Sequence, residues 1–117
     1  TFYIVYRNES RIGLMHGNNV QISKGLLQVF VIYDAAYTIK DIYIQKISSH
    51  DAHSFRSKYY RKQFTQFGIN ALPDWAYIHP PVRVPTNHTI IDHRTFIDAV
   101  TANALFVKHL FLSYANN

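Results

Sequence analysis

Cysteine is absent from this sequence, and its absence excludes several kinds of site. A chain without thiols has no disulfide framework, no thiolate zinc site and no cysteine nucleophile. Glutamate is scarce as well, since Glu9 is the only one. Acid–base chemistry by carboxylates would therefore depend on the few aspartates, and this narrows the enzyme classes open to the chain.

Glycine-rich loops and long apolar runs are also missing. The glycines stand alone at positions 13, 17, 25 and 68, so the sequence contains no phosphate-binding glycine loop. This disfavours nucleotide hydrolysis and dinucleotide binding. No apolar run reaches the ~18–20 residues of a membrane-spanning helix. We therefore expect no bound cofactor, no metal ion and no membrane span.

The residues that are present suit one folded domain. Of the 117 residues, 48% are hydrophobic and 15% are aromatic, which is enough for a core and too apolar for a disordered tail. We expect a single α+β domain over residues 1–117, and its start at Thr1 rather than Met fits an origin in a longer polypeptide. Twelve Lys and Arg face seven Asp and Glu, and the net charge of +5 favours contact with phosphates or other anionic surfaces.

The N-terminal half has the pattern of β-strands. Residues 1–7 alternate between two faces, and residues 38–47 are rich in β-branched side chains. Residues 26–33 are a continuous apolar run typical of a central strand that is covered on both faces. Residues 38–47 also fit a helical period, but their β-branched content favours a strand. A weaker strand over residues 11–16 would end at a turn over residues 17–19. The predicted sheet is antiparallel and has four or five strands.

The C-terminal half has helix signals on either side of a proline-rich arm. Ser49 is a suitable N-cap for a helix over residues 50–67, which would stop at Gly68. Prolines keep residues 69–88 irregular. A second, long helix is expected from about Asp92. Two helices and an arm packed against an antiparallel sheet make an α+β fold.

The first helix contains the strongest candidate site. Its cations recur at helical spacing, where they can neutralise several phosphates and release counterions. A tyrosine among them can stack on a base or donate to a phosphate, while Phe55 and Tyr59 would face the core. The predicted nucleic-acid-binding residues are Arg56, Lys58, Tyr60, Arg61 and Lys62. Supporting cations are available at Arg7, Arg11, Arg83 and Arg94.

The second helix suggests a different function, because its apolar residues extend beyond one face. So broad a stripe is typical of a helix that is deeply buried or partly covered by another subunit. We predict Phe106, Leu110 and Leu112 at a contact with a second copy of the chain or with a partner protein. On this alternative, the chain is an interaction or assembly domain of a larger complex or particle.

Histidines motivate a third hypothesis, that of a metal-free nuclease or toxin domain. One imidazole acting as base and another as acid can cleave RNA, and the candidates are His88 and His93, with Asp92 between them and His79 in the arm. His50 and His53 have a spacing that could hold a metal ion, but the pattern is more typical of an exposed helix start. No motif names a reaction. Nucleic-acid binding is therefore our first hypothesis, and assembly and nuclease activity are the alternatives.

Overall fold

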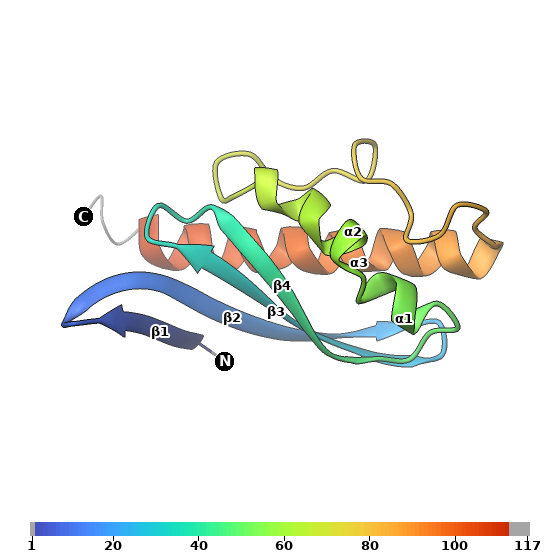
Figure 1. The fold of residues 1–117 in the computed structure, drawn as a ribbon, viewed down its shortest axis with the longest axis horizontal. Helices are drawn as coiled ribbons and strands as arrows, with labels where there is room; N and C mark the ends of the chain where they lie inside the picture. Colours follow the sequence, from blue (N-terminus) through green and yellow to red (C-terminus); the bar gives the residue numbers. More distant parts are fainter. Residues whose placement is uncertain (1, 113–117) are drawn as a thin grey trace.

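The computed structural model describes residues 2–112, with side chains through residue 111. This part folds into one antiparallel sheet and a set of helices (Figure 1), which confirms the expected α+β class. The strands lie in chain order as β1 (Phe2–Arg7), β2 (Ser10–Ile22), β3 (Gly25–Asp34) and β4 (Ile39–Ile47). The helices are α1 (Ala52–Phe55), α2 (Lys58–Lys62), η1 (Gln63–Gln66), α3 (Asn87–Val107) and the π-helical η2 (Lys108–Leu112).

Strands β3 and β4 form the centre of the hydrophobic core, in agreement with their apolar and β-branched sequences. Only one face of β3 is buried and the other is half-buried, so the expectation that residues 26–33 are covered on both faces is wrong. Val29 pairs with Ile44 and Val31 pairs with Ile42, and all four side chains are buried on one face of the sheet. Each such burial contributes about 1.5–3 kcal/mol relative to an exposed side chain. This pairing excludes the helical alternative for residues 38–47.

Strand β2 runs straight through residues 17–19, so the turn expected there is wrong. Gly17 is needed because the Phe30 ring lies against it, and a Cβ at this position would come within 2.4 Å of Phe30 Cε1. The Asn18 amide donates from Nδ2 to the backbone carbonyl of Ala99 in α3, at 3.0 Å. These turn-forming residue types are therefore used for contacts with elements distant in the sequence.

The single helix expected over residues 50–67 is also wrong, because the chain breaks at Ser57. Ser57 has an extended backbone, with ψ of 147°, and its side chain caps α2 by accepting from the Tyr60 amide at 3.2 Å. In one continuous helix, Phe55 and Tyr59 would share a face. The break rotates α2 relative to α1, so that Tyr60 packs in the core beside Phe55 while Tyr59 is 62% exposed.

Helix α3 begins at Asn87, about five residues earlier than predicted, because Thr86 caps it. Thr86 Oγ1 accepts from the Thr89 amide at 3.1 Å, and Thr89 Oγ1 accepts from the Thr86 amide at 3.2 Å. Asp92, the expected start, is instead buried inside the helix. Its carboxylate accepts hydrogen bonds from the amide and hydroxyl of Ser23, at 3.1 and 2.9 Å, and so joins α3 to the β2–β3 turn.

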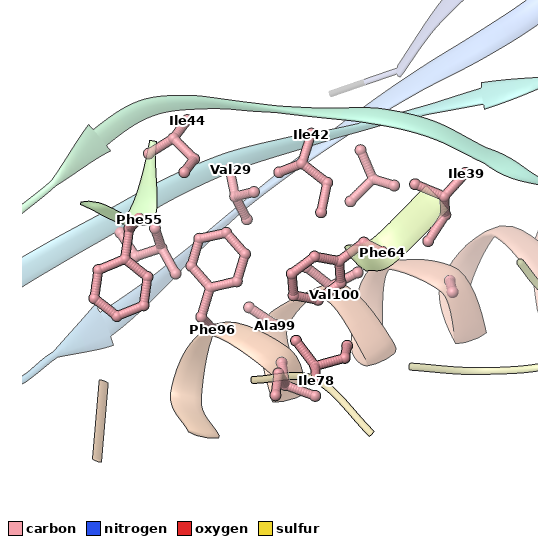
Figure 2. Close-up of a cluster of buried hydrophobic side chains, with 14 of the residues drawn as sticks. Val29, Ile39, Ile42, Ile44, Phe55, Phe64, Ile78, Phe96, Ala99 and Val100 are labelled. Carbon is pink, nitrogen blue, oxygen red and sulfur yellow. The ribbon is translucent and has the colours of Figure 1, made fainter. Parts of the chain in front are cut away.

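The core lies between the sheet and α3, as Figure 2 shows. Val29 and Ile42 project from the strands toward Phe96 and Val100 on α3. Phe96 is fully buried, and its ring packs against the rings of three aromatic residues, at centroid distances of 5.2–5.7 Å. None of the helices in residues 2–112 combines the length and the apolarity that a membrane crossing requires.

Candidate nucleic-acid interface

A groove of about 470 Å³ runs between α2 and the start of β4. Lys58, Arg61 and Lys62 of α2 line one side of it, and Lys40 and Asp41 of β4 line the other. We call it the basic groove. Its lining holds four cationic side chains and one carboxylate. Three of the five residues predicted to bind nucleic acid therefore share one concave surface.

Two arginines of this region are anchored to β4. Arg61 Nη1 lies 2.6 Å from Asp41 Oδ1, and its Nε donates to the Arg56 carbonyl at 3.0 Å. Arg56 donates from Nε and Nη2 to the carbonyls of Ile44 and Gln45, at 3.4 and 3.3 Å. Both guanidinium groups thus connect the α1–α2 segment to the edge strand, and the Asp41 carboxylate already neutralises Arg61.

The lysines of the basic groove are less engaged. Lys58 and Lys62 are both exposed and form no ion pair with any residue that the structure describes. Lys40 Nζ lies 3.8 Å from Asp34 Oδ2, which is a long and exposed ion pair of little strength. These ammonium groups can donate hydrogen bonds to a phosphate without first breaking a strong interaction within the protein.

The basic groove continues into neighbouring depressions through residues that they share. Arg61 joins it to a depression beside Tyr43, and Lys62 joins it to one beside Tyr59. Tyr59 also lines a depression together with His79. His79 in turn lines a last depression, beneath the proline-rich arm. The cations that line the series are Lys40, Arg56, Lys58, Arg61, Lys62, Arg83 and Arg94. Asp41 is the one carboxylate among these lining residues.

Exposed aromatic rings alternate with these cations. Tyr43, Tyr59 and Trp75 each expose more than half of their surface along the same series of depressions. The guanidinium of Arg94 lies over the Trp75 ring, 4.6 Å from its centroid. Cations interleaved with open rings are the composition of surfaces that bind nucleic-acid backbones and unpaired bases.

The structure overturns the expectation that Tyr60 contacts nucleic acid. Tyr60 is fully buried, and its hydroxyl donates to His93 Nδ1 at 2.9 Å, while His93 Nε2 donates to the Ile78 carbonyl at 2.9 Å. Burial raises the pKa of Tyr60, so its hydroxyl stays protonated. Burial also lowers the pKa of His93 and so favours its neutral ring. Tyr59 takes the exposed position on α2 that the sequence had assigned to Tyr60.

The other histidines considered for catalysis or metal binding lie in different surroundings. His88 is exposed in the first turn of α3, and five residues of helix place it roughly 140° around the axis from His93. His79 lines a depression with His93, but both ring nitrogens of His93 are already hydrogen-bonded. His50 contacts the Lys24 ammonium. Within residues 2–112, no group of three His, Asp or Glu could hold a metal ion.

The predicted contact residues at the C-terminal end have mixed positions. Phe106 is 47% exposed, and its ring packs against those of Phe2 and His16, with centroids 5.4 and 5.0 Å apart. Leu110 is half-buried in η2. The side chain of Leu112 lies outside the described residues.

Lys40 and Tyr43 were not among the predicted site residues, because no local pattern in the sequence indicates that two exposed positions of a strand will border a helix. Arg83 and Arg94 were anticipated as supporting cations and do line the series, whereas Arg7 and Arg11 do not line it. The chain matches no protein-family model, and no curated protein or solved structure is significantly similar to it. Its function has to be argued from the site.

Proposed function

We propose that this domain binds nucleic acid through the basic groove and the depressions that adjoin it. One observation supports this proposal above the others: seven Lys and Arg side chains against one carboxylate line a series of depressions, each of which shares a lining residue with the next. The whole chain has only twelve Lys and Arg, so more than half of its positive side chains lie on this surface.

The physical basis of binding would be counterion release. Each phosphate that a lysine neutralises frees condensed cations, and log Kd then rises with log salt by about 0.7 per contact on a single strand. Lys58 and Lys62 are suited to this task because they have no ion pair within the described residues. Arg61 and Arg56 would instead hold α2 and β4 in place, so that the lysines stay on one concave surface.

Fluorescence anisotropy with labelled oligonucleotides tests the proposal. The expected result is submicromolar binding at low salt that weakens steeply between about 50 and 200 mM. Lys24→Ala combined with Lys108→Ala lowers the net charge as much as the loss of two groove lysines would, and both residues are exposed and lie outside the groove lining. This control variant should bind as the wild type does. Absence of binding at the lower salt would refute the proposal.

A second candidate, an assembly domain, is favoured by the C-terminal end of α3. Leu105 and Phe106 are both 47% exposed there, although large apolar residues are more often buried. Sedimentation at increasing concentration would reveal a contact between copies, and Phe106→Ala should abolish it. A constant monomer mass over that range would remove this candidate.

A further inference from the structure

The face of the sheet opposite the core presents a row of aromatic rings. Tyr3 of β1, Phe30 of β3 and Tyr43 of β4 lie on this face, with centroids 6.4 Å apart from Tyr3 to Phe30 and 6.3 Å apart from Phe30 to Tyr43. Tyr3 is 50% exposed and Tyr43 is 56% exposed. We call these residues the aromatic row. Helix α3 packs on the opposite face, which carries Val29 and Ile42 (Figure 2), so it does not cover the row.

Local structure holds the middle ring of the row in place. Phe30 lies directly opposite Gly17 on one side and Tyr43 on the other in the strand register. Because Gly17 has no Cβ, the Phe30 ring can lie against β2, and any side chain at position 17 would displace it. The Phe30 ring therefore has a defined position across the sheet, with an open tyrosine on each side of it.

The aromatic row ends at the cations of α2. Tyr43 lines a depression together with Arg56 and Arg61, and that depression shares Arg61 with the basic groove. Asp41 lies two residues before Tyr43 on β4 and forms the ion pair with Arg61. The depression beside Tyr43 therefore joins the cations of α2 to one end of the aromatic row.

We propose that the ligand is single-stranded nucleic acid, with unpaired bases stacked on the aromatic row and phosphates held by the basic groove. This inference rests on the proposed function. Base stacking needs an accessible base face, which a single strand offers and the interior of a duplex does not. Charge complementarity supports a nucleic acid as the occupant of the open face, because its neighbours are Arg56, Arg61, Lys58 and Lys62.

The test compares Tyr43→Ala with Tyr43→Phe on single-stranded and duplex probes of about 16 nucleotides, in DNA and in RNA. Removal of one stacking ring should weaken single-strand binding at least about five-fold, and duplex binding should stay unchanged. The phenylalanine variant keeps the ring and should bind like the wild type. Tyr77→Ala is the matched control, because Tyr77 is exposed in the arm and lines none of these depressions.

Tyr3→Ala provides an independent variant at the far end of the row, and circular dichroism checks that each variant is folded. Single-strand binding that Tyr43→Ala and Tyr3→Ala leave intact would overturn the inference. If Lys58→Ala combined with Lys62→Ala still weakened binding in that case, the proposed function would stand without it. A wild-type protein that prefers duplex would also overturn the inference, and a protein that binds neither probe would overturn both.

Discussion

Replacing Lys58 and Lys62 by alanine should weaken nucleic-acid binding while the fold stays intact. Neither side chain is buried or has an ion pair within the described residues, so both replacements together should change the free energy of unfolding by less than about 1 kcal/mol. Arg61 is left unchanged because its 2.6 Å ion pair with Asp41 connects α2 to β4. An alanine at that position would confound binding with structure.

The magnitude follows from counterion release. Each lysine–phosphate contact on a single strand contributes a salt exponent of about 0.7, which amounts to about five-fold in affinity at 0.1 M salt. Removal of both lysines should therefore raise Kd about 25-fold at 0.1 M salt, and only about five-fold at 0.3 M. The slope of log Kd against log salt should fall by about 1.4.

Anisotropy titrations of the wild type and the double variant over this salt range measure both quantities. Lys24→Ala with Lys108→Ala is the charge-matched control, and its Kd should stay close to that of the wild type. An equal loss of affinity in the control and in the groove variant would refute the reasoning. It would mean that net charge, rather than the basic groove, attracts the ligand.

Three further predictions concern the packing that positions this surface. Phe96→Ala should lower the free energy of unfolding in urea by about 4 kcal/mol, because Phe96 is fully buried among aromatic rings. Asn103→Ala should cost about 2 kcal/mol in the same assay, because the buried Tyr33 hydroxyl would lose Asn103 Oδ1, its hydrogen-bond acceptor at 2.8 Å. Acidification below pH 6.5 should destabilise the fold. Since the pKa of His93 is lowered by burial, the unfolded chain takes up its proton first, which costs at most about 1.4 kcal/mol per pH unit in thermal denaturation.

Each of these predictions has a matched control. Phe96→Leu should cost less than Phe96→Ala, and equal losses would contradict the cavity argument. Tyr33→Phe removes one of the partners of Asn103 and should cost less than Asn103→Ala. His93→Gln does not titrate, so the pH dependence below 6.5 should become shallower. An unchanged pH dependence in that variant would exclude His93 as its source.

The central strands could be predicted because their signal is local. Residues 26–33 and 38–47 combine apolar runs with β-branched side chains. Such side chains favour the extended backbone and are stabilised when they are buried between a sheet and a helix. The turn expected at residues 17–19 failed for the opposite reason. Asn18 bonds to α3, at Ala99, and Gly17 accommodates Phe30, so their roles depend on partners that no local window contains.

The helix boundaries depended on capping signals that were present in the sequence. Ser57 caps α2 and Thr86 caps α3, and both are ordinary N-cap residue types. If Ser57 is taken as an N-cap, the helix predicted over residues 50–67 is divided in two. The same N-cap would have predicted Tyr60 as the buried residue and Tyr59 as the exposed one, because the cap determines which residues of α2 face the core.

The candidate site was predictable only in part. The cations of α2 are neighbours in the sequence, so their helical spacing brought Lys58, Arg61 and Lys62 together. Lys40 and Tyr43 come from a different element, and their place beside α2 depends on how β4 packs against the helical segment. The aromatic row depends on which residues of different strands lie opposite one another, and the pattern within any single strand does not contain that information.

The location of binding is tested most directly by two-dimensional NMR of the amide groups during titration with a single-stranded oligonucleotide. We expect the largest shift changes in α2, in β4 around Tyr43, and at Tyr3 and Arg83. Such changes would place the ligand on the basic groove and the aromatic row together. Changes confined to the C-terminal end of α3, or no changes at low salt, would contradict the account.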